Sequence, residues 1–117
     1  CPTKAIEEPF IVNANKCLAY HTLENRDEQL PKNIINKMGN WIAGCDICQD
    51  VCPWNHKKIP STTEPDLQPA QWILNMTKKD ALSWSDTEWK TNLSKSALKR
   101  MKPWMWRRNI NSISNNK

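Results

Sequence analysis

The 117-residue sequence predicts a mainly helical protein with little β structure, in which a cysteine-bearing region precedes a helical basic tail. Three observations support this prediction. Cysteines gather between residues 45 and 52, apolar residues recur at helical spacing in the second half, and basic residues accumulate near the end of the chain. A stretch rich in proline follows the cysteines, so we expect one region over residues 1–60 and a helical region over residues 61–117.

Short elements are expected in the first region. Residues 10–12 form an apolar run that is typical of a strand. An asparagine precedes residues 16–23 and can cap a helix there. A second helix is expected from Pro31, which fits a first helical turn, to Gly39, which can end it. Residues 46–51 leave room for one or two helical turns between cysteines.

The second region contains signals for helices. Trp72, Ile73 and Met76 suggest a short helix. The sequence Ser85-Asp-Thr-Glu88 is a capping box, and it predicts a helix that buries Trp89 and Leu93 on one face.

The tail is expected to be helical but interrupted. A serine before Ala97 can cap a helix through Met101. Pro103 should kink or interrupt that helix because proline lacks the N–H that a helix interior needs. We expect the helix to resume over residues 104–113.

The clustered cysteines follow the spacing C-x2-C-x3-C-P, and a second Cys-Pro pair stands at residues 1 and 2. This spacing is the tail of the bacterial ferredoxin motif C-x2-C-x2-C-x3-C-P. There, the closely spaced cysteines hold one 4Fe–4S cube, and the cysteine before proline binds a neighbouring cube. The two Cys-Pro pairs therefore predict a ferredoxin-like two-cluster region whose first part is missing, so that the chain is a fragment.

Disulfides and zinc are the alternative explanations for five cysteines. No export signal or long apolar stretch is present, which argues against disulfides. Zinc usually takes two CxxC pairs or one pair with two histidines, whereas His21 and His56 stand alone. Iron–sulfur ligation is favoured, and colour separates the two metals because only the iron–sulfur protein is brown.

A 4Fe–4S cube needs four thiolates. The ferredoxin motif would place its first cysteine at position 42, which is Ile42, so Cys17 is the remaining nearby candidate. Following the crossed pattern of two-cluster ferredoxins, the predicted set for one cluster is Cys1, Cys17, Cys45 and Cys48. Cys52 would then serve the second cluster. The alternative for Cys17 is a buried helix cysteine.

Charge is distributed unevenly along the chain. Residues 1–88 hold all twelve acidic residues and carry a net charge of −3, whereas residues 89–117 hold eight basic and no acidic residues. This segregation predicts an arm that binds a polyanion, with a solvated helix face as the alternative. The candidate contacts are Lys95, Lys99, Arg100, Lys102, Arg107 and Arg108. In one helix, the three lysines would share a face. Trp104 and Trp106 could stack on an unpaired base.

Longer motifs resemble one family. They are Cys-Pro-Thr-Lys-Ala-Ile at residues 1–6, Lys-Cys-Leu-Ala-Tyr-His-Thr-Leu-Glu at residues 16–24, Gly-Asn-Trp-Ile-Ala-Gly-Cys-Asp-Ile-Cys-Gln-Asp-Val-Cys-Pro-Trp-Asn at residues 39–55, Ser-Ala-Leu-Lys-Arg at residues 96–100, and Arg108-Asn109. In this order they resemble epoxyqueuosine reductase, over essentially the whole chain.

The resemblance implies a bacterial cytoplasmic oxidoreductase that uses cobalamin and two 4Fe–4S clusters to reduce epoxyqueuosine to queuosine in tRNA. It also implies that this chain is the C-terminal part, with the cobalamin contacts and the catalytic residues outside it. The family's cluster cysteines fall on the five cysteines of this chain, and the six basic residues would contact tRNA. We further expect a monomer, an electron donor protein or other reductant, and no membrane association.

Other functions fit parts of the sequence. The first is a stand-alone ferredoxin-type electron carrier, and the second is a fragment of another corrinoid-dependent reductase. Neither needs a strongly basic tail. A zinc-stabilised RNA-binding module is the remaining alternative.

Overall fold

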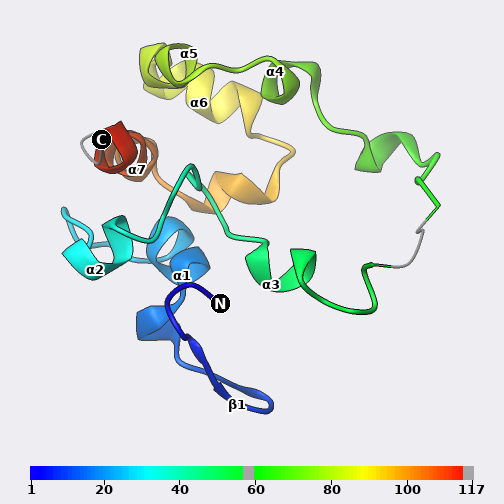
Figure 1. Cartoon of the computed structure of the whole chain (residues 1–117). Helices are drawn as coiled ribbons and strands as arrows, with labels where there is room; N and C mark the ends of the chain where they lie inside the picture. Colours follow the sequence, from blue (N-terminus) through cyan, green and yellow to red (C-terminus); the bar gives the residue numbers. More distant parts are fainter. Residues whose placement is uncertain (57–59, 115–117) are drawn as a thin grey trace.

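The computed structural model describes residues 1–56 and 60–114 (Figure 1). Its strands are β1 (Ile6–Glu8) and β2 (Ile11–Val12), and its α-helices are α1 (Leu18–Leu23), α2 (Lys32–Ile35), α3 (Ile47–Asp50), α4 (Gln71–Leu74), α5 (Lys78–Ser83), α6 (Asp86–Asn92) and α7 (Pro103–Ser114). Three 3₁₀ turns are η1 (Ala14–Lys16), η2 (Pro65–Leu67) and η3 (Ala97–Arg100). The predicted mainly helical fold is therefore confirmed. Within the described ranges, no helix has the length and apolar character needed to span a bilayer.

Within the described residues, the β structure is one short hairpin near the start of the chain. β1 and β2 pair antiparallel, with Ile6 opposite Val12. Phe10 lies at the turn in the left-handed region (φ 66°), and its side chain is fully exposed. The predicted strand at residues 10–12 is thus shorter than expected, because Phe10 belongs to the turn.

The first region has a small apolar core. The buried residues Leu18, Leu30, Ile34 and Met38 come from α1, α2 and the segments beside α2. Ile113, in the last turn of α7, completes this cluster. A residue from the end of the chain therefore closes the core of the cysteine-bearing region.

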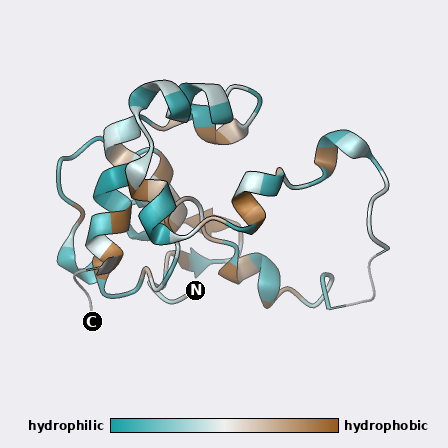
Figure 2. Ribbon diagram, turned by 90° about the horizontal axis from the view of Figure 1, so that it is seen from above, coloured by the Kyte–Doolittle hydropathy of each residue, from teal (hydrophilic) through white to brown (hydrophobic). Residues whose placement is uncertain are grey.

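A larger core, rich in tryptophan, holds the second region together. Its buried members are Ala81, Trp89, Leu93, Met101, Met105, Trp106 and Ile110. The ring of Trp84 stacks on that of Trp106, with centroids 6.1 Å apart and planes 6° from parallel. Trp106 Nε1 also donates a hydrogen bond of 2.9 Å to the carbonyl of Ala81. Hydrophobic and hydrophilic residues alternate along these helices (Figure 2), as expected for elements buried on one face.

Capping boxes start α5 and α6. The predicted box at α6 is confirmed, with Ser85 Oγ accepting from Glu88 N and Glu88 Oε2 accepting from Ser85 N. Trp89 and Leu93 are buried as expected. The equivalent box between Thr77 and Asp80, which starts α5, was not predicted.

The tail is organised differently from the prediction. Ala97–Arg100 is a 3₁₀ turn, and Pro103 begins α7 instead of interrupting a helix. Proline fits this first position because its missing N–H has no intrahelical partner there. Lys95, Lys99 and Lys102 therefore do not lie on one continuous helix, and the expected shared face is wrong.

Helix α7 contacts both regions. It packs against α1 and against α5, and it lies between them in Figure 1. The boundary expected near residue 60 stays a prediction, since the longest helix of the second region also completes the core of the first.

Candidate iron–sulfur site

Four cysteines line one cavity of about 100 Å³. They are Cys1, Cys17, Cys45 and Cys48. The remaining walls are mainly apolar and include Ile6, Val12 and Leu18. The arrangement brings together residues from the chain start, from α1 and from both sides of the start of α3. It agrees with the predicted ligand set, and the assignment of these four thiols to one cluster stays a prediction.

Local backbone geometry explains how these cysteines converge. Cys17 occupies the N-cap of α1 with an extended backbone, directly after η1. Gly44 has a φ of 76°, a conformation that favours glycine, and it turns the chain immediately before Cys45. Cys48 lies within the single turn of α3. Tight turns therefore bring Cys17 to the cavity in place of the first cysteine of the ferredoxin motif, whose position is Ile42 here.

Hydrogen bonds and burial act on the sulfur atoms. Ala5 N donates to Cys1 Sγ at 3.3 Å. Burial raises the pKa of the Cys45 thiol, a backbone hydrogen bond from Ile47 opposes this rise, and the nearby Cys17 and Cys48 raise the pKa further. Iron binds the thiolate, so cluster formation must remove this proton. N–H groups that point at the sulfurs are among the features that set the potential of a 4Fe–4S cluster.

The cavity suits a cluster better than a single metal ion. Across the described ranges, no three His, Cys, Asp or Glu side chains are grouped so that they could hold one ion. A cube binds one thiolate at each iron, so its ligands surround a volume and do not meet at a point. Four cysteines that line a mostly apolar cavity fit that requirement.

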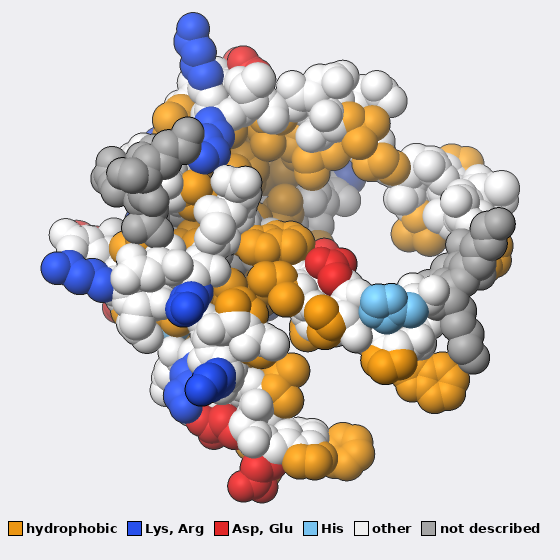
Figure 3. Space-filling view, viewed as in Figure 1, with side chains coloured by type: hydrophobic (Ala, Val, Ile, Leu, Met, Phe, Trp, Pro, Cys, Tyr) orange, Lys and Arg blue, Asp and Glu red, His pale blue; other side chains and the backbone are white. Residues whose placement is uncertain are grey.

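Cys52 lies outside the residues that line this cavity. It follows α3 in a turn where Asn55 N donates to the Cys52 carbonyl at 2.9 Å and Asn55 Nδ2 donates to the Gln49 carbonyl at 2.9 Å. Val51 and Trp54 beside it are largely exposed, as are the apolar residues of the hairpin. Figure 3 shows hydrophobic side chains exposed on this face. The position of Cys52, outside the cavity, fits a ligand of a different cluster.

The predicted polyanion-binding residues fall into three groups. Lys95, Lys99 and Lys102 are exposed, and none of them forms an ion pair within the described part of the chain. Arg100, which is exposed, and Arg107, which is half-buried, each form an ion pair. Arg100 contacts Glu24 at 2.7 Å, and the guanidinium of Arg107 contacts the carboxylate of Asp86.

Arg108 is buried and serves the fold. Its guanidinium donates to the carbonyls of His21, Asn25 and Asp27, at 3.0, 2.9 and 2.6 Å, and to the side-chain oxygen of Asn109. Burial lowers the pKa of this guanidinium, which nevertheless stays charged at neutral pH. These bonds satisfy carbonyls at and just after the end of α1, so the Arg108 guanidinium is not available to contact a polyanion.

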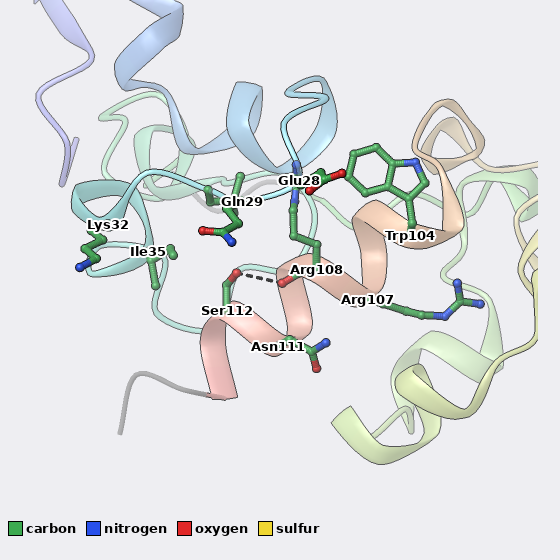
Figure 4. A pocket seen from close by; sticks show the side chains of 10 residues that line it. Glu28, Gln29, Lys32, Ile35, Trp104, Arg107, Arg108, Asn111 and Ser112 are labelled. Carbon is green, nitrogen blue, oxygen red and sulfur yellow. Dashed lines mark hydrogen bonds between the residues drawn. The ribbon is translucent and has the colours of Figure 1, made fainter.

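The two tail tryptophans also differ. Trp106 is buried in the tryptophan-rich core, so it offers no free face for a base. Trp104 is 41% exposed and lines a cavity of about 580 Å³ between residues 28–35 and α7 (Figure 4). The guanidinium carbon of Arg108 lies 5.3 Å from the centre of the Trp104 ring. Of the two, Trp104 is the candidate for stacking.

Comparison with known protein families identifies the class of this site. Residues 1–55 match the family of the 4Fe–4S double cluster binding domain. The first region is therefore an iron–sulfur domain that binds 4Fe–4S clusters.

Similarity to individual proteins extends over nearly the whole chain. The chain is 81% identical to the epoxyqueuosine reductase of Prochlorococcus marinus (strain NATL2A), over 97% of this chain and 36% of that protein. It is 58% identical to the epoxyqueuosine reductase of Synechococcus sp. (strain CC9605), over 93% of this chain and 34% of that protein.

Solved structures agree. A crystal structure of selenomethionine-labelled epoxyqueuosine reductase matches this chain with a TM-score of 0.87 at 29% identity. A crystal structure of epoxyqueuosine reductase with an epoxyqueuosine-modified tRNA-Tyr stem loop matches it with a TM-score of 0.84 at 32% identity. Each match covers 99% of this chain and 30% of the other. Over nearly its whole length the chain is similar to epoxyqueuosine reductases, as the sequence motifs indicated, and it spans about a third of the length of these curated relatives.

Proposed function

We propose that this chain is the iron–sulfur part of an oxidoreductase that reduces epoxyqueuosine to queuosine in tRNA. The observation that carries the proposal is the convergence of four cysteines on one cavity, in a chain similar to epoxyqueuosine reductases. In this proposal the chain relays electrons toward a cobalamin bound by another part of the enzyme, and an electron donor protein or reductant supplies them. The enzyme is cytoplasmic, where its tRNA substrate is found. A stand-alone electron carrier is less favoured, because the relatives are nearly three times as long.

The cysteines have separate roles in this proposal. Cys1, Cys17, Cys45 and Cys48 hold one 4Fe–4S cluster, while Cys52 contributes to a second cluster whose other ligands lie outside this chain. A bound cluster supplies one-electron transfer chemistry. The protein contributes the thiolates, the N–H donors to sulfur and the apolar walls that limit access of water.

Iron content tests the ligand assignment. Anaerobic reconstitution of the chain should give about four irons per molecule and a brown protein. Cys45→Ser should lose most of this iron, because it removes a ligand of the complete site. Cys52→Ser is the matched control and should keep about four irons. Iron loss in the Cys52 variant, or retention in the Cys45 variant, would contradict the assignment.

The second part of the proposal concerns the tRNA substrate. We propose that Lys95, Lys99 and Lys102 contact its phosphates, because they are exposed and unpaired in the described structure. Trp104 offers a partly exposed ring for stacking on an unpaired base. The support is the charge and exposure of these side chains, together with the neighbour that was solved with a tRNA stem loop.

Salt dependence tests the phosphate contacts. In the complete, cluster-loaded reductase, replacing Lys99 and Lys102 by alanine should weaken tRNA binding. It should also reduce the slope of log affinity against log salt concentration by roughly one to two. The control replaces Lys78 and Lys79, two exposed lysines near the start of α5, and should leave binding unchanged. The visible spectrum should be the same in all variants. Equal tRNA affinity across salt concentrations in the Lys99/Lys102 variant would refute the phosphate contacts.

A further inference from the structure

Two fully buried polar side chains join α7 to the loop that carries Cys45. Thr22 in α1 and Asn109 in α7 both have no exposed surface. Asn109 Nδ2 donates to the carbonyl of Thr22 at 2.9 Å and to the carbonyl of Ile42 at 2.8 Å. One amide group therefore holds the end of α1 and the loop before Cys45 at the same time.

Thr22 makes a second connection to that loop. Its Oγ1 accepts a hydrogen bond of 3.0 Å from Gly44 N, the backbone group next to Cys45. The same hydroxyl donates to the carbonyl of Leu18 at 2.8 Å, so its orientation is fixed within α1. Gly44 is also the left-handed residue that turns the chain toward the cavity. The position of Cys45 is thus tied to α1 at the residue directly before it.

Helix α7 also supports the Cys17 side of the cavity. Arg108 donates to the carbonyl of His21, and Nε2 of His21 lies 2.8 Å from the carbonyl of Asn15, two residues before Cys17. The adjacent residues Arg108 and Asn109 therefore reach the segments that precede two of the four cysteines. Neither residue lines the cavity formed by the four cysteines.

We propose that Thr22 and Asn109 are positioning residues for the iron–sulfur cluster, fixing Cys45 relative to α1 and Cys17. The proposal rests on the ligand assignment made under Proposed function. Groups behind the ligands commonly set the geometry and potential of a metal site. Here they also connect the cluster to α7, the helix that carries Trp104 of the proposed RNA surface.

The test uses two substitutions of one residue. Thr22→Val keeps the shape of the side chain but removes the acceptor for Gly44, whereas Thr22→Ser keeps the hydroxyl. Thr91→Val, at an exposed threonine of α6, is the control for the same chemical change. All variants are compared in the cluster-loaded protein by electron paramagnetic resonance of the reduced cluster, by its midpoint potential and by iron content.

The expected result is specific to the lost acceptor. Thr22→Val should shift and broaden the resonance signal, change the potential and speed cluster loss in air, while Thr22→Ser and Thr91→Val should match the parent. Unchanged spectrum, potential and cluster lifetime in a folded Thr22→Val protein would overturn the proposal. If the parent itself binds no cluster, the proposed function fails instead, so the two failures are distinguishable.

A measurement on the unaltered chain covers the case in which Thr22→Val does not fold. Gly39 and Gly44 both have a positive φ, but Gly44 N donates to a buried hydroxyl whereas Gly39 is exposed. Amide hydrogen exchange of Gly44 should be slower than that of Gly39 by about fivefold or more, the factor expected from one intramolecular hydrogen bond. Equally fast exchange at both glycines would also overturn the proposal.

Discussion

The cysteine-bearing region, residues 1–56, and the helical region, residues 60–114, are stabilised in different ways. The first buries a small apolar core that needs Ile113 from α7, and three of its cysteines are only partly buried. The second buries a larger cluster in which several tryptophan rings contact each other. From this comparison we expect packing to be sufficient for the helical region, and metal ligation to supply much of the stability of the cysteine-bearing region.

Removal of iron should give the largest difference in amide protection between the two regions. Chelation under reducing conditions should abolish most amide protection around Cys17 and α3, because the cluster replaces a larger core there. Protection in α5 and α6 should persist, since their core contains no cysteine. Hydrogen exchange with mass spectrometry measures both in one sample. Equal loss of protection in both regions would show that they unfold as one unit.

The next largest expected effect is on the free energy of unfolding, after a substitution at the junction between the two regions. Arg108→Ala should lower the free energy of unfolding by roughly 3 kcal/mol, because three backbone carbonyls lose a charged donor. Arg100→Ala removes only an exposed pair with Glu24 and should cost about 0–1 kcal/mol. Denaturant titration of the cluster-loaded protein compares the two. A similar cost for both arginines would mean that Arg108 does not join the regions.

Sequence reasoning worked best where the signal is local. The spacing of Cys45, Cys48 and Cys52 predicted an iron–sulfur site, and the box from Ser85 to Glu88 predicted the start of a helix, since each depends on residues a few positions apart. The hairpin was only half predicted because β1 has the polar sequence Ile-Glu-Glu.

The long-range contacts of the tail residues were not predicted. Arg107 and Arg108 are adjacent and chemically identical, yet one pairs with Asp86 near the surface and the other is buried against α1. Trp104 and Trp106 differ in the same way. A helical repeat of 3.6 residues separates such neighbours by face, but the sequence alone does not show which face meets another element. The Arg108-Asn109 motif was noted only for its family resemblance, and Arg108 was predicted to contact tRNA, so the role of these residues at the junction was missed.

The tryptophan-rich core offers a third test. Trp106→Phe removes the hydrogen bond to Ala81 and leaves unfilled space beside Trp84, so the free energy of unfolding should fall by roughly 2 kcal/mol. Iron content should not change, because the core contains no ligand. Trp104→Phe, at a partly exposed site on the same helix, should cost less than about 1 kcal/mol. Loss of iron in Trp106→Phe would show that the regions are more tightly coupled than their cores suggest.

The smallest expected effect concerns acid stability of the helical region. Hydrogen bonds from the backbone and side chain of Ser85 lower the pKa of Glu88. Because the folded pKa lies below the unfolded one, this contribution is complete above the ordinary pKa and is lost as pH falls through the lower, folded value, from about pH 5 downward. Glu88→Gln keeps an acceptor but does not titrate, so its melting temperature should fall less than that of the parent on acidification.

The comparison between parent and variant isolates Glu88, because acid also protonates the cluster thiolates in both proteins. Ser85→Ala provides a graded control, since it removes the hydroxyl partner but leaves the backbone N–H that contributes most to the lowered pKa. Its acid response should be intermediate. Carbon-13 NMR titration of the Glu88 carboxyl measures the lowered pKa directly. An ordinary pKa for Glu88, with identical acid melting of parent and Glu88→Gln, would mean that the capping box is not closed in solution and that α6 depends on the packing of Trp89 alone.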